Sequence, residues 1–406
     1  MDKINVIDSI MGSGKTSWAI QYMNEAPAET RFIYITPFLD EIQRVKSAVK
    51  NRIIYEPDIK NDEGRKMRSL KQLIADGQDI ASTHSLFRAA DAELIELIRS
   101  SNYVLILDEV MQVIDNLGVK RDDILTLLES KRIGIDENHR VHWLRQDYEE
   151  GKFTTVKMTA DAGNLYLYRK SFIVWTFPPA AFKAFKNVYV MTYLFEGQLQ
   201  RAYFDLFDIP FQYLAIKQGD DQRYSLTKYC REAENRKKFM ELMTVYEGKY
   251  NNVGDGYYEF SSTKLRNYSD QHRKKIKTNT AGFFKHKADA RKDEIMWTTL
   301  KEKKDTKNGY GGPGYARGEF VEWNKRATNE YRDKRALAYL FNRFTHPDET
   351  VFFEENKIPV NEEVLALSDL LQWIYRSRIR DDKPIHLYIP SSRMRGLLKS
   401  WGKYEI

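Results

Sequence analysis

The chain has 406 residues and a formal net charge of +7, from 65 Lys and Arg against 58 Asp and Glu. Hydrophobic residues make up 42% of it and charged residues 30%, which excludes a collagen, a mostly disordered chain and a membrane-embedded protein, and the length favours two domains. The basic excess is local, because residues 264–307 hold 14 Lys and Arg against 6 Asp and Glu, and the rest of the chain is close to neutral. This stretch therefore predicts contact with an anionic partner.

The cysteine content and the hydropathy of the sequence indicate the cellular compartment. Cys230 is the single cysteine, which excludes an internal disulfide framework and a multi-cysteine metal site. The sequence has no apolar run of about 18 residues, and it begins without a signal-peptide pattern. We therefore expect a soluble, cytoplasmic protein with no membrane partner.

Short apolar strands alternate with helical stretches through the first half of the chain. Ile4–Asp8 is strand-like and is followed by a glycine-rich turn and a helix over about 16–24. A second helix is predicted over 38–49, and further strands at Arg31–Thr36, Asp79–Thr83, 103–107 and 188–192. Because strand 103–107 is almost entirely apolar, we expect it to be buried on both faces. Such strands alternating with helices predict a parallel sheet covered on both faces.

A second pattern follows after an interruption. Residues 118–180 are polar and aromatic with weak periodicity, and they predict an insertion. A second segment begins with a strand near 211–216 and ends with a strand at 383–389 and a short helix. The chain is therefore predicted to be α/β, with one parallel-sheet domain at 1–205 and a second at 206–406 that carries a basic insertion at about 254–318.

The most specific motif is Ser9-Ile-Met-Gly-Ser-Gly-Lys-Thr16, which directly follows a strand and opens a helix, as a P-loop does. Gly12 and Gly14 allow the turn whose backbone N–H groups face an anion, and the helix N-terminus adds partial positive charge. Lys15 can reach the β- and γ-phosphates, and the Thr16 hydroxyl can ligate Mg²⁺. The common pattern has Gly at the first position, where this chain has Ser9, another small residue. The residues expected to bind the nucleotide are Ser9, Met11, Gly12, Ser13, Gly14, Lys15 and Thr16.

An acidic pair, Asp108-Glu109, follows the buried strand 103–107. An acid at the carboxyl end of a parallel strand lies beside the phosphate loop in such sheets. Asp108 would hold Mg²⁺, and Glu109 would orient and deprotonate the attacking water. Taken alone, the pair could equally be a helix N-terminal acid pair favoured by the helix dipole. Together with the P-loop upstream, it predicts hydrolysis of a nucleoside triphosphate.

Several segments in this order resemble the motifs of superfamily 2 helicases. The P-loop resembles motif I. The segments that resemble motifs Ia, Ib, II and III are, in that order, Tyr34-Ile-Thr-Pro-Phe-Leu39, Ala81-Ser-Thr-His-Ser-Leu86, Leu107-Asp-Glu-Val110 and Val190-Met-Thr-Tyr193. Near the C-terminus, residues 371–380 look like motif VI, and residues 320–329 weakly occupy the place of motif V. The resemblance spans nearly the whole chain and is specific at motifs I and II. The compact layout is similar to phage-encoded helicases and to the ATPase part of viral origin-binding proteins.

Two departures from the family pattern concern the branch of superfamily 2 helicases that the chain resembles. Motif II reads Asp-Glu-Val-Met instead of Asp-Glu-Ala-Asp. Only eight residues precede Ser9, which leaves no room for the upstream glutamine motif that reads adenine in DEAD-box RNA helicases. The sequence therefore counts against the DEAD-box branch.

The resemblance implies two RecA-like domains in tandem that enclose ATP and Mg²⁺, with arginine fingers from the second domain stabilising transition-state charge on the γ-phosphate. In motif VI, Tyr375 replaces the family glycine and Ile379 stands where the last arginine is expected. Arg376 matches by spacing, and the second arginine is either Arg378 or Arg380. The implied catalytic residues of this motif are Gln372, Arg376, Arg378 and Arg380; the alternative is a solvated basic helix end.

The resemblance also implies contacts with the nucleic-acid backbone. Those of motifs Ia and Ib would come from Thr36, Pro37, Phe38, Thr83, His84 and Ser85, although His84 could equally be a capping or core histidine. The basic stretch adds Arg273, Lys274, Lys275 and Lys277, with Tyr268 and Trp297 nearby. Lys and Arg interleaved with aromatics are typical of a groove that binds single strands by charge and stacking. A solvated helical face is the alternative.

Three functional hypotheses follow. The first is an ATP-dependent helicase or translocase acting on single-stranded or forked DNA, favoured over RNA, in phage-type replication or recombination, with replication proteins as possible partners. Such a protein would work in the host cytoplasm. The second is an ATP-switched origin- or fork-binding protein without strand separation. The third, a P-loop NTPase unrelated to nucleic acid, is disfavoured by motifs Ia and VI and by the basic stretch.

Overall fold

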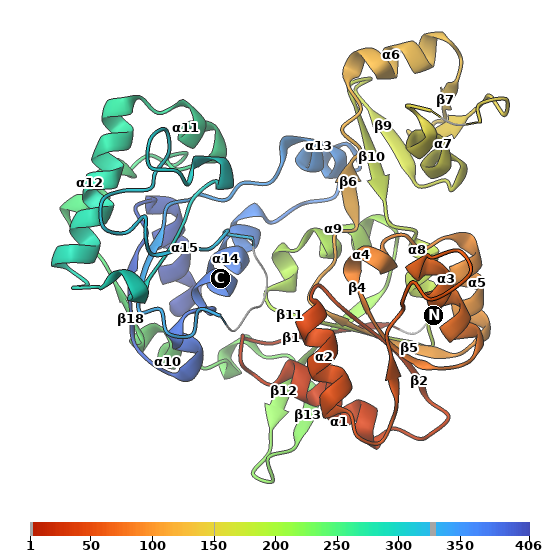
Figure 1. Cartoon of the computed structure of the whole chain (residues 1–406), viewed down its shortest axis with the longest axis horizontal. Coiled ribbons are helices and arrows are strands. Elements are labelled where there is room, and N and C mark those ends of the chain that lie inside the picture. Colours follow the sequence, from red (N-terminus) through yellow and green to blue (C-terminus); the bar gives the residue numbers. More distant parts are fainter. Residues whose placement is uncertain (1–2, 150, 325–329) are drawn as a thin grey trace. The chain divides into compact units, whose positions relative to one another are not determined.

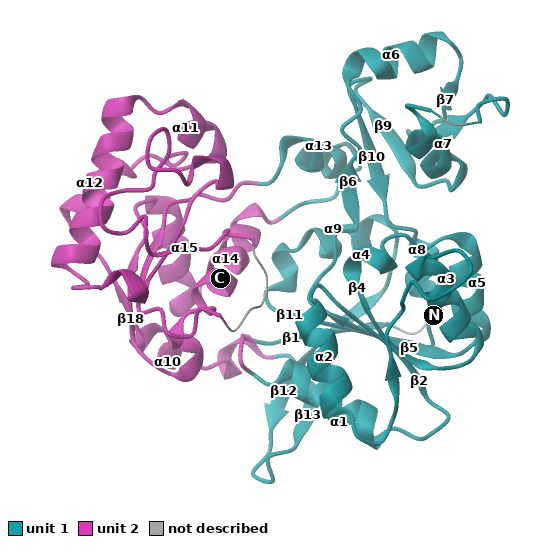
Figure 2. Ribbon diagram, viewed as in Figure 1, with its two compact units in different colours: residues 1–9, 13–229, 345–360 teal, residues 10–12, 230–344, 361–406 magenta. Residues whose placement is uncertain are grey.

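The computed structural model describes residues 3–149, 151–324 and 330–406, and the chain divides into two compact units (Figure 2). Each unit is built on its own largely parallel sheet, one of eight strands and one of five. The predicted α/β class with two such domains in tandem is confirmed. The first unit comprises residues 1–9, 13–229 and 345–360, and the second comprises 10–12, 230–344 and 361–406.

The eight-stranded sheet of the first unit has the order β13-β12-β1-β11-β5-β2-β4-β3 (Figure 1). Every neighbouring pair is parallel except β12 and β13, which form an antiparallel hairpin at one edge. The strands are β1 (Ile4–Asp8), β2 (Arg31–Thr36), β3 (Ile54–Tyr55), β4 (Asp79–Thr83), β5 (Tyr103–Asp108), β11 (Asn187–Thr192), β12 (Phe211–Gln218) and β13 (Tyr224–Lys228). The strands predicted in the first half of the sequence are all present.

Two hydrophobic cores flank this sheet because alternate side chains of a strand point to opposite faces. In β2, Phe32 and Tyr34 pack into one core, and Ile33 and Ile35 pack into the other. The first core also receives α1 (Lys15–Glu25) and α2 (Leu39–Ala48). The second core receives α3 (Lys66–Ala75), α5 (Ala92–Ser100), α8 (Pro179–Lys183) and α9 (Leu199–Leu206). The short α4 (His84–Phe87) follows β4 directly.

The predicted insertion is a folded module with a core of its own. Its main sheet is antiparallel, in the order β6-β10-β9, and a two-stranded sheet of β7 and β8 lies in the same segment of chain. The elements are β6 (Ile114–Asn116), α6 (Arg121–Glu129), β7 (Ile133–Ile135), β8 (Val141–Trp143), α7 (Thr154–Asp161), β9 (Leu165–Tyr168) and β10 (Phe172–Thr176). The module therefore begins slightly before the predicted residue 118 and ends slightly before residue 180.

A late segment of the chain packs against this module. The ring of Phe352, from α13 (Pro347–Glu355), lies 5.3 Å from that of Tyr168 in β9. The Tyr168 hydroxyl accepts a hydrogen bond of 2.6 Å from the Asn356 amide. Arg169 forms an ion pair of 3.0 Å with Glu355. Residues 345–360 are therefore part of the first unit although they are flanked in sequence by the second.

The second unit contains a five-stranded, all-parallel sheet in the order β14-β18-β17-β15-β16. Phe283 of α12 stacks on Tyr388 of β18 at 5.2 Å, and Trp373 of α14 meets Tyr339 of β17 at 5.2 Å. The strands are β14 (Met243–Val245), β15 (Ile295–Thr298), β16 (Glu319–Phe320), β17 (Ala336–Tyr339) and β18 (Ile385–Tyr388). The helices are α10 (Arg236–Glu241), α11 (Ser262–Asn267), α12 (Asp270–His286), α14 (Glu362–Ile374) and α15 (Ser392–Gly402).

The structure differs from the sequence-based boundaries in two places. The strand at 211–216, expected to begin the second domain, is β12 and pairs with β1, so the first unit extends to residue 229 and not to 205. The basic segment 254–318 is only partly an insertion, because it contains β15, a central strand of the second sheet. Within the described residues, no helix is long and apolar enough to span a membrane.

Candidate nucleotide and nucleic-acid sites

The glycine-rich loop joins β1 to α1 at the carboxyl edge of the first sheet. Gly12 and Gly14 have φ angles of +79° and +92°, a conformation that glycine adopts with little strain. Thr16 lies in the first turn of α1, and Lys15 begins that helix. The Lys15 ammonium donates a hydrogen bond to the Ser9 carbonyl at the start of the loop. The loop thus has the backbone conformation and the donors that a phosphate-binding loop requires.

Ser9, the residue in place of the usual first glycine, ties the loop to the sheet. Its hydroxyl accepts a hydrogen bond of 2.9 Å from the Ile216 backbone N–H in β12. Its own N–H donates to the Thr192 carbonyl of β11 at 3.1 Å. A glycine could make only the second of these bonds. Ser9 therefore fixes the base of the loop to the strands that flank β1.

Asp108 ends β5, which is separated from β1 by β11 alone. Its carboxylate accepts a hydrogen bond of 2.6 Å from the Tyr34 hydroxyl. Burial disfavours the charged form and, with the neighbouring Glu109 charge, raises the pKa of the Asp108 carboxyl to about 7, although Tyr34 and Lys15 act in the opposite direction. The site therefore concentrates negative charge where a divalent cation would stabilise the ionised form.

Glu109 directly follows the strand in a left-handed backbone conformation, with φ of +63°. This conformation costs a residue with a side chain of the order of 1 kcal/mol, and such positions cluster at functional sites. The Glu109 N–H donates to the Met191 carbonyl at 2.9 Å, so the turn is held against β11. The first sheet thus brings Lys15, Asp108 and Glu109 to one edge, as the motifs predicted.

The residues of motifs Ia and Ib lie at the neighbouring strand ends. Thr36 is fully buried at the end of β2, whereas Pro37 and Phe38 are partly exposed. The Thr83 hydroxyl caps α4 by accepting from the Leu86 N–H at 3.3 Å. His84 is 9% exposed, and its Nε2 donates to the Asp108 carbonyl at 3.0 Å, which places the proton on Nε2. His84 therefore links motif Ib to the acidic motif.

The motif VI residues lie at the end of α14 and in the short 3₁₀ helix Arg378–Asp381 of the second unit. Arg376 is 4% exposed, and its guanidinium donates to the Glu322 carbonyl at 3.3 Å. Arg378 donates through Nε to the Pro384 carbonyl at 2.6 Å. The Arg380 guanidinium lies 5.9 Å from the centre of the Tyr375 ring. Gln372 is half-buried on α14. Of the weak motif V segment, residues 325–329 lie outside the described residues.

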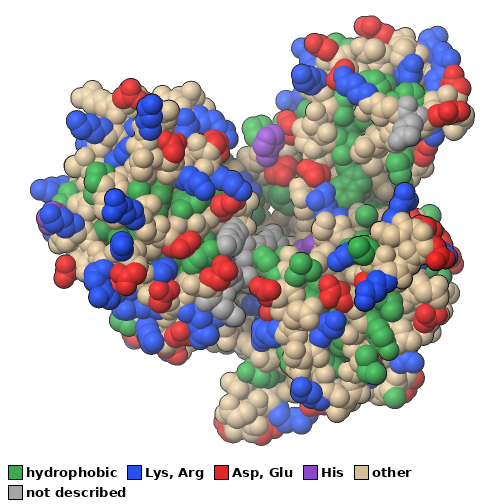
Figure 3. Space-filling model, in the orientation of Figure 1, with side chains coloured by type: hydrophobic (Ala, Val, Ile, Leu, Met, Phe, Trp, Pro, Cys, Tyr) green, Lys and Arg blue, Asp and Glu red, His purple; other side chains and the backbone are tan. Residues whose placement is uncertain are grey.

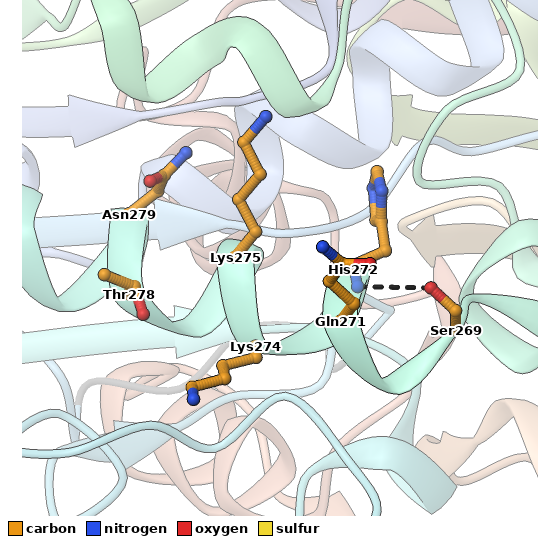
Figure 4. A pocket seen from close by; sticks show the side chains of 7 residues that line it. All are labelled: Ser269, Gln271, His272, Lys274, Lys275, Thr278 and Asn279. Carbon is orange, nitrogen blue, oxygen red and sulfur yellow. Dashed lines mark hydrogen bonds between the residues drawn. The ribbon is translucent and has the colours of Figure 1, made fainter.

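Helix α12 carries the basic residues predicted to contact nucleic acid. Arg273 pairs with Asp270 and also donates to the Tyr268 carbonyl, and Lys277 donates to the Thr306 carbonyl at 2.6 Å. Lys274 and Lys275 are exposed and extend from different sides of the helix (Figure 4). Lys and Arg side chains are numerous over this part of the second unit (Figure 3). The two adjacent lysines are thus the basic pair best placed to meet an anion.

The aromatic residues predicted to accompany these lysines are placed differently. Trp297 is 1% exposed because it lies in β15, inside the second sheet, so it has no face open to a base. The half-buried Tyr268 stacks on His272 with ring centres 4.2 Å apart and donates to Glu259. The pairing of basic and aromatic residues expected around Trp297 is therefore absent there.

Tyr224 lies beside the phosphate loop, although no motif in the sequence predicted this position. A Cβ atom on Gly14 would lie 2.1 Å from Cε1 of Tyr224, so the ring rests on the loop backbone. Gln21 of α1 holds this hairpin residue in place by donating to the Tyr224 carbonyl at 3.1 Å and accepting from its N–H at 2.9 Å. Tyr224 is 203 residues from Gln21 in the sequence, and the hairpin β12–β13 brings it next to the loop in space.

Comparisons with known proteins agree with this architecture. Residues 114–175 match the family described as the YonV middle domain, and residues 237–402 match the YonV C-terminal Rossmann-like domain. The chain is 40% identical, over 99% of both chains, to the SPbeta prophage-derived uncharacterized protein YonV of Bacillus subtilis (strain 168). The chain belongs to the YonV family.

Solved structures show which larger fold the two units share. The structure named XPD_APO superposes with a TM-score of 0.54 at 12% identity, covering 99% of this chain and 95% of that one. The structure named XPD_Helicase gives a TM-score of 0.51 at 10% identity, covering 98% and 94%. At these identities the likeness concerns the fold alone.

Proposed function

We propose that this protein is an ATP-dependent nucleic-acid motor of the superfamily 2 helicase type. The observation that carries the proposal is the placement of Lys15 and Thr16, at the start of α1, and of the Asp108–Glu109 pair, at the end of β5, on the same carboxyl edge of the first sheet. Lys15 would bind the β- and γ-phosphates, and Thr16 and Asp108 would hold Mg²⁺. Glu109 would accept the proton of the attacking water, and Arg376 would stabilise charge on the γ-phosphate.

Nucleic acid is proposed as the partner, with single-stranded or forked DNA favoured. The basic helix α12 supports this, since Lys274 and Lys275 are exposed on it. The fold likeness to helicases and the prophage origin of the Bacillus relative are consistent with a role in phage-type DNA replication or recombination.

The direct test is the rate of ATP hydrolysis with single-stranded DNA, duplex DNA or RNA, and without nucleic acid. A motor is expected to hydrolyse ATP several-fold faster with the strand on which it moves. Unchanged rates with all three would contradict the proposal. A fork-unwinding assay run in parallel separates a helicase from an ATP-switched binding protein, which would bind the fork without separating its strands.

Arg376→Ala is expected to lower kcat for ATP hydrolysis about 100-fold or more while leaving nucleotide affinity nearly unchanged, because an arginine finger acts on charge that develops in the transition state. Turnover and binding of a fluorescent ATP analogue measure the two effects. Arg99→Ala, at an exposed ion pair on α5, is the matched control, and thermal unfolding reports any loss of folding. Lost affinity with unchanged kcat would contradict the finger role.

A further inference from the structure

The second unit carries an exposed aromatic pair, Tyr257 and Tyr258. Their side chains are 48% and 62% exposed, and among the described residues they are the only large hydrophobic side chains of this unit with such exposure. The two rings meet edge to face with centres 5.0 Å apart. Phe344 lies beside both, at 5.9 Å from Tyr257 and 5.5 Å from Tyr258. The rings therefore form one aromatic surface that is open to solvent.

This aromatic surface is held from beneath by a buried polar scaffold. Asn342, which follows β17 and is fully buried, donates from its amide to the Tyr257 carbonyl at 2.8 Å and the Glu259 carbonyl at 2.9 Å. Its side-chain oxygen accepts a hydrogen bond of 2.9 Å from Arg393. The Arg393 guanidinium also lies 4.4 Å from the Phe344 ring centre and 5.4 Å from that of Tyr257. These contacts fix the rings before a ligand arrives, which lowers the entropic cost of binding.

Two adjoining hollows lie between the segment that carries the tyrosines and the basic helix. The first, of about 520 Å³, is lined by Gly256 and Glu259, which flank the tyrosines in sequence, and it reaches Ser269 and His272. The second, of about 450 Å³, shares Ser269 and His272. It continues along α12 past Lys274 and Lys275 (Figure 4). The hollows thus form one polar path that begins at the sequence neighbours of the two tyrosines and ends at the lysines of α12.

The charges along the path favour an anionic chain. Of the two acids that line the first hollow, Asp255 and Glu259, Glu259 is already engaged, since it accepts from Tyr268 and forms an ion pair of 3.5 Å with Lys264. Among the described residues, no ion-pair partner is found for Lys274 or Lys275. Single-stranded nucleic acid has unpaired base faces that stack on aromatic rings and phosphates that attract ammonium groups. A duplex hides its base faces, so it could use only the lysine end.

We propose that Tyr257 and Tyr258 are a base-stacking platform for single-stranded nucleic acid, whose phosphates continue along α12 to Lys274 and Lys275. The platform rests on the proposed function, because it defines how the motor would hold its strand. It adds a stacking contact, and thus a preference for unpaired bases, to the backbone contacts of the helicase motifs.

The test measures binding of a fluorescent oligo-dT to the full chain by anisotropy. Tyr258→Ala is expected to weaken binding about fivefold or more, since removing one stacked aromatic costs about 1–3 kcal/mol per base. Tyr258→Phe, the matched control, keeps the ring and should bind like the unchanged protein. Because Tyr258 is mostly exposed, thermal unfolding should be unaltered in both variants.

An abasic oligonucleotide of the same length separates stacking from charge. The unchanged protein should bind it more weakly than oligo-dT, whereas Tyr258→Ala should bind the two strands with more similar affinities. Lys274→Glu with Lys275→Glu should weaken both strands and lower the salt dependence of binding. Equal affinity of Tyr258→Ala and the unchanged protein for oligo-dT would overturn the platform alone. Absence of binding and of ATPase stimulation by any nucleic acid would overturn the proposed function as well.

Discussion

Replacing Lys15 with alanine is expected to reduce ATP hydrolysis at least 100-fold and to abolish any ATP-driven unwinding. Lys15 is the cation at the first turn of α1, and its ammonium now donates to the Ser9 carbonyl within the loop. A bound triphosphate would take the place of that carbonyl as acceptor, and the lysine would neutralise charge on the phosphates. Loss of one such preorganised donor commonly costs 10²–10³ in rate.

The measurement is steady-state ATPase activity together with binding of a fluorescent ATP analogue. Lys3→Ala is the matched control, since Lys3 is exposed at the other end of β1 and should leave both unchanged. The Lys15 variant should unfold at the same temperature, because the side chain is only partly buried. Retained unwinding by Lys15→Ala would show that the nucleotide site lies elsewhere.

Glu109→Gln is expected to bind ATP with nearly unchanged affinity but to hydrolyse it about 10²–10⁴-fold more slowly, as loss of a general base does. The substitution preserves size and removes only the charge. Since the Glu109 charge raises the pKa of Asp108, the variant should lower that pKa and keep Asp108 ionised over a wider pH range. Slower hydrolysis therefore could not be caused by protonation of Asp108.

Glu41→Gln is the matched control for this variant. Glu41 also raises the pKa of the Asp108 carboxyl. It lies on α2, where it forms an ion pair with Arg44, and not at the end of β5 beside Asp108. It should therefore reproduce the electrostatic effect on Asp108 without loss of turnover. Single-turnover hydrolysis of bound ATP compares the two variants. Similar rates for Glu109→Gln and the unchanged protein would remove Glu109 from the chemistry.

The parts of the fold that could be predicted are those coded locally. The strand at 103–107 was identifiable because its residues are nearly all apolar, and all of them are buried in β5. The phosphate loop was identifiable because its glycines, its lysine and its threonine must stand together in sequence. The positions of Asp108 and Glu109 followed because acids at the ends of parallel strands meet at one edge of a sheet.

Other features depend on contacts between residues far apart in the chain. Nothing in the sequence 211–216 says which sheet the strand joins; that choice rests on pairing with β1 and on the Ser9 hydroxyl. Trp297 looked available for stacking because it stands among lysines, yet the central place of β15 buries it. Conversely, Tyr257 and Tyr258 gave no signal, since their exposure depends on Asn342, which lies more than 80 residues away in sequence.

Because residues 345–360 belong to the first unit, no single cut of the chain separates the two units. A chain cut between residues 229 and 230 would leave α13 on the wrong piece, detached from the sheet that it covers. Phe352 and Phe353, both nearly fully buried, would then face water at a cost of about 1.5–3 kcal/mol each. Neither fragment would then hold all of the residues that its unit buries, so we expect the two units to fold from one continuous chain and not from separately expressed halves.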